Sequence, residues 1–219
     1  QKTNLPDDNL QKSVGIIDII SGSVGSWTVV SSLVGGGMAE THQDANITIL
    51  PTGRALLTGG TSRDYSSQSG TARLTPRLWN PANKKWDEDL ANEFPAITLA
   101  KAPVPRDYHS VAILLPDGSV LTAGGEVDKV RRETAAIYRP PYLFADSTGT
   151  PAYQPTISCL DSVITYGQRF TIVLSDTTAI SKVSFIRPSS VTHGVNMEQR
   201  FLSLAIETNY VSGSQRRVE

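Results

Sequence analysis

Short apolar runs, each closed by a turn with proline and glycine, recur along the first two thirds of the chain. Residues 47–60 read ITILPTGRALLTGG, and residues 112–125 read AILLPDGSVLTAGG. Each copy places a Pro-x-Gly turn between two β-rich runs, which predicts a β-hairpin. Two unrelated hairpins with similar turns are the alternative. Coincidences at one common offset favour a repeat: Leu50/Leu115, Pro51/Pro116, Gly53/Gly118, Leu56/Leu121 and Gly59-Gly60/Gly124-Gly125.

An aromatic strand and a further turn follow each predicted hairpin. Residues 77–86 read RLWNPANKKW and residues 136–140 read AIYRP, while residues 16–27 look like the same element of a preceding unit. A hairpin followed by two more strands is the four-strand blade of a β-propeller. Kelch-type blades repeat about every 50 residues. The two hairpins begin 65 residues apart, at residues 47 and 112, which predicts one blade with an insertion at 63–75.

The pattern of predicted turns and strands changes near residue 151. A linker bearing proline and glycine covers 148–155, and alternating apolar strands are predicted at 168–174, 182–186 and 201–206. No further Gly-Gly hairpin follows, which favours a separate β-sandwich module. The predicted fold class is therefore all-β. An incomplete set of kelch-type β-propeller blades fills residues 1–150, and an immunoglobulin-like β-sandwich, also incomplete, fills residues 151–219.

Composition narrows the chemistry that the chain can carry. The 219 residues have 20 basic and 21 acidic side chains, a formal net charge of −1, which favours neither a nucleic acid nor a membrane surface as partner. No apolar run reaches the roughly 18–20 residues of a membrane span. A single cysteine excludes an intrachain disulfide, a cysteine-rich zinc site and an iron–sulfur cluster made by this chain alone. A metal site must use His42, His109, His193, carboxylates or tyrosines.

Two of the three histidines stand in segments that are candidates for a site. Tyr108 and His109 precede the second hairpin, and on a regular strand their side chains would point to opposite faces. The flanking prolines, Arg106 and Asp107 predict an irregular backbone there, which would let both side chains reach one metal ion. His193 lies in an exposed loop of PSSVTHGVNMEQRF. Taken singly, each is more simply interpreted as a solvated histidine, and His42 as structural or surface.

Taken together, these segments resemble a known family. RDYHSVAILLPDGSVLTAGGE, AIYRPPYLF and KVSFIRPSSVTHGVNMEQRFLSL look like the C-terminal part of the radical-copper oxidases, the galactose oxidase and glyoxal oxidase group. The resemblance implies a copper-dependent oxidase, secreted, that converts a primary alcohol or aldehyde with O2 and produces H2O2. It also implies that Tyr108, His109 and His193 bind one copper ion, with Tyr108 as the catalytic base that accepts the substrate proton.

Two departures from the family lead to further expectations. The family's redox cofactor is a tyrosine joined to a cysteine by a thioether, and the lone Cys159 does not match the cysteine of that pair. Residues 1–150 suffice for about three blades, whereas a propeller needs at least four. We therefore expect a C-terminal portion of a larger oxidase-like chain, inactive alone, whose remaining blades come from another segment or chain. The alternative is a non-catalytic kelch-like protein that binds partners or carbohydrates.

Overall fold

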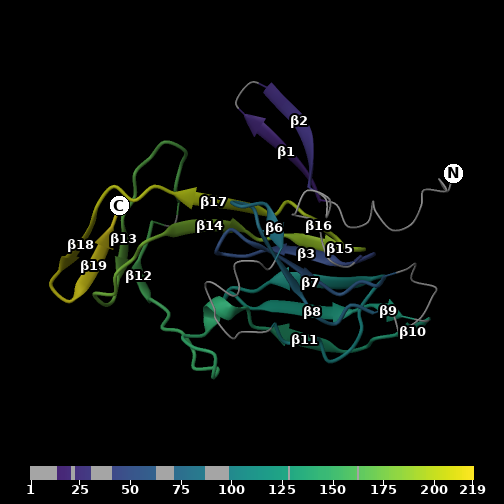
Figure 1. Ribbon diagram of the computed structural model, residues 1–219. Helices are drawn as coiled ribbons and strands as arrows, with labels where there is room; N and C mark the ends of the chain where they lie inside the picture. Colours follow the sequence, from purple (N-terminus) through teal and green to yellow (C-terminus); the bar gives the residue numbers. More distant parts are fainter. Residues whose placement is uncertain are drawn as a thin grey trace.

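The computed structural model describes residues 14–20, 23–30, 41–62, 72–86, 99–127, 129–161 and 163–219. Within these ranges the chain is all-β, as predicted, and its one helical element is the short 3-10 helix η3 (Pro141–Leu143). None of these residues forms a helix that is long and apolar enough to cross a membrane. Figure 1 shows a group of sheets from the middle of the sequence and a C-terminal part, joined by a long two-stranded ribbon.

The first predicted hairpin is part of a four-stranded antiparallel meander. Its strands are β3 (Asn46–Ile49), β4 (Ala55–Thr58), β5 (Arg77–Asn80) and β6 (Lys85–Trp86), in sequence order across the sheet. The turn between β3 and β4 depends on Gly53, whose φ of 81° is readily adopted only by glycine. Both this hairpin and the predicted 77–86 hairpin are confirmed.

The second hairpin repeats the first and forms a three-stranded sheet. Strands β7 (Ser110–Leu114), β8 (Val120–Gly124) and β11 (Ala135–Tyr138) lie in the order β11-β8-β7, and a small hairpin, β9 (Glu126–Val127) and β10 (Val130–Arg131), is inserted after β8. Gly118 has the same φ of 81° as Gly53. In each turn the glycine N–H donates to the leucine carbonyl three positions earlier, at 2.9 Å. The repeat in sequence is thus a repeat in structure.

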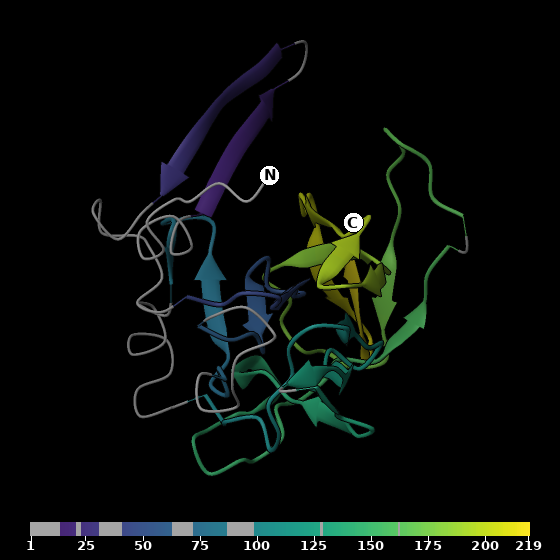
Figure 2. The same ribbon diagram turned by 90° about the vertical axis from the view of Figure 1, so that its right-hand side faces the viewer.

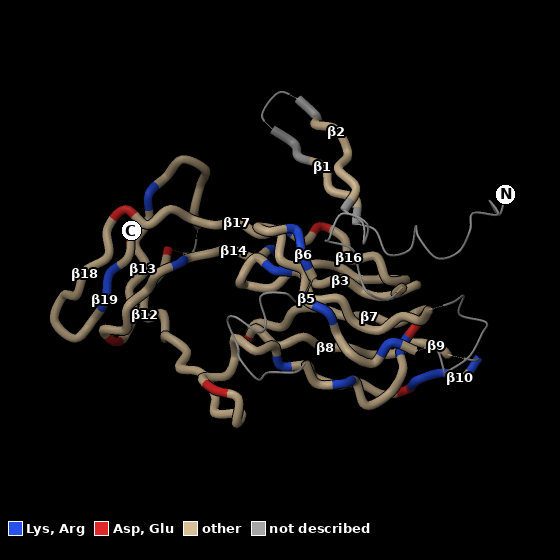
Figure 3. Tube along the Cα trace, in the orientation of Figure 1, with Lys and Arg blue, Asp and Glu red and all other residues tan. Residues whose placement is uncertain are grey.

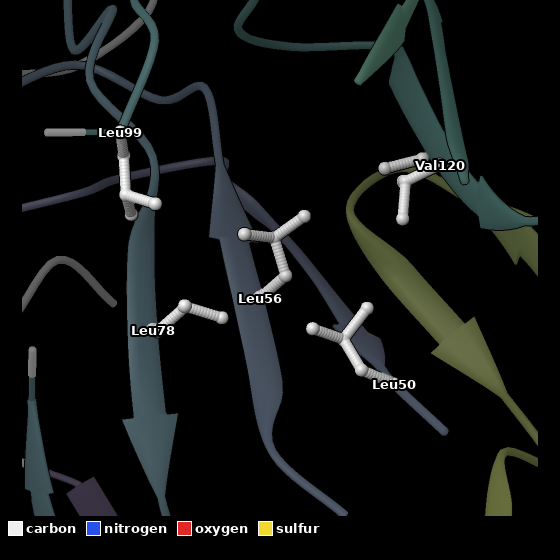
Figure 4. Packing of buried hydrophobic residues seen from close by; sticks show 6 residues of the cluster. Leu50, Leu56, Leu78, Leu99 and Val120 are labelled. Carbon is white, nitrogen blue, oxygen red and sulfur yellow. The ribbon is translucent and has the colours of Figure 1, made fainter. Parts of the chain in front are cut away.

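The apolar positions of the repeat meet in one core between the two sheets. Figure 4 shows Leu50, Leu56, Leu78 and Val120 pointing toward one another from the two sheets, with Leu99 beside them on the segment that precedes the second sheet. Strands β3 and β7 lie next to each other, and the Asn46 amide donates to the Ser110 hydroxyl at 2.8 Å. Asn46 begins an Asn-Ile-Thr glycosylation pattern, but its side chain is only 2% exposed and is held in this contact. A glycan on this side chain would therefore be incompatible with the packing of the two sheets.

A separate hairpin, β1 (Val14–Ile20) and β2 (Ser23–Val30), covers the predicted 16–27 element. Figure 2 shows this hairpin projecting away from the other sheets. Near its base, Ile16 packs against the buried cluster of Leu57, Trp79 and Trp86. The ring centres of the two tryptophans are 5.3 Å apart.

The C-terminal part consists of a four-stranded sheet and a ribbon packed on it. The sheet has the order β12-β13-β19-β18, and the ribbon pairs β14 with β17. Ile172, Leu174 and Val218 form its core with Phe170, Val183 and Ile206. The ribbon runs toward the repeat sheets and continues into the hairpin of β15 and β16 (Figure 1). Strand bounds are β12 (Ile157–Cys159), β13 (Ile172–Leu174), β14 (Val183–Arg187), β15 (Ser190–Thr192), β16 (Val195–Met197), β17 (Arg200–Leu204), β18 (Asn209–Ser212) and β19 (Gln215–Val218).

Basic and acidic residues are interspersed along the described chain (Figure 3), in keeping with the balanced composition. Strands β3 and β7, which face the β15–β16 hairpin, carry no charged residue. None of the sheets formed by the described residues closes on itself. The propeller blades, the immunoglobulin-like sandwich and the division at residue 151 therefore stay predictions.

A loop after η3 offers a pH-dependent prediction. The Asp146 carboxylate accepts hydrogen bonds from the hydroxyl groups of Thr150 and Thr148 and from their backbone N–H groups. These bonds lower its pKa from 3.8 to about 2. A carboxyl group whose pKa is lower in the folded than in the unfolded chain stabilises the fold at pH values above its unfolded pKa. This stabilisation is lost as the pH falls through the folded pKa. We expect an NMR titration of the Asp146 carboxyl carbon to have its midpoint near pH 2. A midpoint near the ordinary value would show that these bonds do not form.

Candidate metal centre

Tyr108 and His109 lie in a turn immediately before β7. His109 has a φ of 63°, and the Ser110 N–H donates to the Asp107 carbonyl at 2.9 Å, which closes the turn. Because the backbone reverses here, the two neighbouring rings do not point to opposite faces. Their centres are 3.8 Å apart. The irregular backbone predicted from the flanking residues is confirmed.

Two buried polar residues anchor this turn. Asp107 is fully buried, and its Oδ2 accepts a hydrogen bond from the Thr61 hydroxyl at 3.1 Å. Arg106 is 5% exposed, and its guanidinium donates to the Gly124 carbonyl at 2.6 Å and to the Thr134 hydroxyl at 3.0 Å. Burial, and then the neighbouring Arg132, lowers the pKa of Arg106. Both side chains therefore tie the turn to neighbouring segments, away from solvent.

The paired glycines that end the repeated hairpins lie against the segment that carries Tyr108 and His109, and this close packing explains why they are glycines. Gly60 N–H donates to the Arg106 carbonyl at 2.8 Å. Gly59 has a φ of 71°, and a Cβ at this position would lie 2.6 Å from that carbonyl oxygen. Side chains are therefore excluded from this position. The first hairpin supports the segment that carries Tyr108 and His109.

His193 occupies the turn of the β15–β16 hairpin. His193 and Gly194 both have positive φ, 52° and 73°, as the two central residues of a type I′ hairpin turn require. The His193 ring centre is 4.7 Å from that of His109 and 5.9 Å from that of Tyr108. The hydroxyl of Thr192 lies 2.7 Å from His193 Nδ1. Two segments far apart in sequence thus bring three rings together.

The spacing and chemistry of the three rings fit one metal ion. Metal–imidazole bonds are about 2.0 Å long, so the ring centres of two imidazoles on one ion lie within roughly 6 Å of each other. His109 and His193 meet this condition. Imidazole nitrogens with a phenolate oxygen are donors that suit Cu(II). Tyr108 is half-buried and both histidines are exposed, so a small molecule could reach the cluster.

Other candidate donors lie elsewhere. His42 Nδ1 is 3.1 Å from the Gly59 carbonyl, so this histidine has a structural contact. Cys159 is exposed on β12 in the C-terminal sheet. Among the described residues, no group of three or more His, Cys, Asp and Glu side chains is close enough to hold a metal. Two imidazoles and a phenol are therefore the donors that the described chain assembles.

A cavity of about 480 Å³ lies apart from the three rings, between the two repeat sheets. Arg106 and Ser110 line it, but Tyr108, His109 and His193 do not. The anchoring roles of Arg106, Asp107 and Thr61 were not predicted from the sequence. The sequence holds one signal for these contacts. The paired glycines that end both hairpins indicate that another backbone segment packs closely against them.

Comparison with known proteins places these observations in a family context. Residues 154–219 match the galactose oxidase-like early set domain. Galactose oxidase of Gibberella zeae is 32% identical over 165 residues, which cover 74% of this chain and 22% of that protein. The chain resembles the radical-copper oxidases, the galactose oxidase and glyoxal oxidase group. The family resemblance expected from the motifs is therefore confirmed.

Further relatives include a protein of Vitis pseudoreticulata and a solved structure. The aldehyde oxidase GLOX of Vitis pseudoreticulata is 27% identical over 185 residues, 78% of this chain and 33% of that protein. A fungal alcohol oxidase of the AA5 family, solved in complex with copper, matches with a TM-score of 0.74 and 26% identity over 95% of this chain and 41% of that one. The chain thus spans a fifth to a third of these curated relatives.

Proposed function

We propose that this chain carries the copper-binding part of a copper-dependent oxidase that acts on primary alcohols or aldehydes, uses O2 and produces H2O2. The observation that carries the proposal is the meeting of Tyr108, His109 and His193 from two separate segments. Relatives named as galactose oxidase and aldehyde oxidase, and an alcohol oxidase solved with copper, support the reaction class.

Each ring has a role in this proposal. His109 and His193 hold the metal through imidazole nitrogen, and Tyr108 contributes its phenolic oxygen. When bound, copper supplies a one-electron redox centre and stabilises a phenolate ligand. Tyr108 then has an oxygen that can accept the hydroxyl proton of a small alcohol or hydrated aldehyde at the exposed side of the cluster.

The second redox centre is proposed to come from outside these 219 residues. The family's tyrosine–cysteine thioether needs a cysteine beside the metal, whereas Cys159, the single cysteine, is exposed on β12. We assign the sheet of β3–β6 and the sheet of β7, β8 and β11 as kelch-type blades, and residues 151–219 as the sandwich module. In this proposal the whole protein is secreted, and the 219-residue chain alone does not turn over substrate.

Copper titration tests the proposal directly. The 219-residue chain should bind one Cu(II), with an electron paramagnetic resonance spectrum that shows coupling to two imidazole nitrogens. A non-catalytic kelch-like protein, the alternative, predicts no specific copper uptake and no such coupling. Peroxide production from alcohols or aldehydes should be absent from this chain and present in the full-length protein. Full-length protein that binds copper but yields no peroxide would contradict the oxidase assignment.

A further inference from the structure

We infer that Asn196 and Gln199 are positioning residues: their side-chain amides hold the β15–β16 hairpin on β3 and β7, and thereby bring His193 to Tyr108 and His109. This inference deepens the proposed function and rests on it for the role of copper. The hydrogen bonds that carry it join groups of the protein itself.

Gln199 completes the open edge of β3 as a neighbouring strand would. Its Oε1 accepts from the Ile49 N–H at 2.6 Å, and its Nε2 donates to the Ile47 carbonyl at 2.9 Å. On its other side β3 pairs with β4. Alternate residues of a strand direct their backbone groups to the same edge, so one amide can satisfy both Ile47 and Ile49.

Asn196 connects the hairpin to both repeat sheets at once. Its Nδ2 lies 3.2 Å from the Ile47 carbonyl of β3 and 3.3 Å from the Ala112 carbonyl of β7. Ala112 is in the strand that starts directly after His109. A single amide group therefore connects the His193 hairpin to the strand that directly follows His109.

The hairpin needs such contacts because it is small. Strands β15 and β16 have three residues each and pair only with each other, and an isolated two-stranded hairpin is marginally stable in water. Its turn is seated closely, since a Cβ on Gly194 would lie 3.0 Å from the Ala45 carbonyl oxygen. The spacing His193-x-x-Asn196-x-x-Gln199 thus has a physical meaning: one residue reaches the metal, and two fix the hairpin.

The substitution Gln199→Glu separates positioning from bulk, because glutamate has nearly the same shape. It keeps an acceptor for the Ile49 N–H but places a carboxylate oxygen against the Ile47 carbonyl. We expect about tenfold weaker Cu(II) binding in competition with a chelator and weakened coupling to one nitrogen. Asn196→Ala should act in the same direction. The matched control Gln215→Glu lies on β19 in the C-terminal sheet and should leave both readouts unchanged.

Two further measurements make the inference decidable. In a His193→Ala background, Gln199→Glu should have no additional effect on copper affinity, because the hydrogen bonds of Gln199 act on the metal only by positioning His193. In the metal-free chain, NMR contacts between the His109 and His193 rings should be present in the wild type and lost in Gln199→Ala. Retention of these contacts, or equal weakening of copper binding in the His193→Ala background, would overturn the inference. Absence of copper binding by the wild type would instead refute the proposed function. The NMR contacts between the rings would still test whether Gln199 positions His193.

Discussion

Replacement of His193 by alanine should weaken Cu(II) binding by the 219-residue chain at least hundredfold. Loss of a residue that merely orients a ligand already costs 10–100-fold in metal affinity, so loss of the ligand itself costs more. His109→Ala should have the same effect, because the two rings lie 4.7 Å apart and serve the same ion in the proposed site. Electron paramagnetic resonance of either variant should show coupling to one imidazole nitrogen at most.

His42→Ala is the matched control for this prediction. It removes a histidine whose ring contacts the Gly59 carbonyl and lies outside the ring cluster, so copper affinity should stay within a few fold of the wild type. Thermal unfolding of all three variants tests whether the fold persists. A His193→Ala variant that keeps both nitrogen couplings would remove this residue from the site. A large loss of copper affinity in His42→Ala, with thermal unfolding unchanged, would point to a different copper site.

The local elements of this fold were predictable because turn chemistry is local. The Pro-x-Gly turns at Gly53 and Gly118 identify both hairpins in the sequence, and the structure gives each glycine a φ of 81°. The irregular backbone before β7 was likewise predictable from the residues flanking Tyr108 and His109. No pattern within either segment indicates that His193 should meet His109. That expectation depended on the family resemblance.

The supports of the site were less predictable than its rings. Arg106, Asp107 and Gln199 each act through one or two side-chain hydrogen bonds to groups distant in sequence. Such bonds have no periodicity, and a buried arginine or a half-buried glutamine looks like any surface residue until the fold is known. Paired glycines are the exception, because they mark a close approach even when the partner is unknown.

That close approach leads to the second large effect: Gly59→Ala should destabilise the chain by roughly 2–5 kcal/mol. Non-glycine residues in the left-handed region cost about 1–2 kcal/mol, and crowding in a packed site adds about 1–3 kcal/mol. Gly59 incurs both, because its φ is 71° and a Cβ would lie 2.6 Å from the Arg106 carbonyl oxygen. Urea unfolding of wild type and variant measures the difference.

Gly213→Ala separates the two causes. Its φ of 64° is similar, but nothing lies within 4 Å of the added Cβ, so only the backbone cost of about 1–2 kcal/mol should remain. Relief of the clash at Gly59 must move the Arg106 backbone, which leads directly into Tyr108 and His109. We therefore expect Gly59→Ala, unlike Gly213→Ala, to weaken copper binding as well. Equal destabilisation by both substitutions would mean that the paired glycines provide only backbone freedom, and that the first hairpin does not support the metal centre.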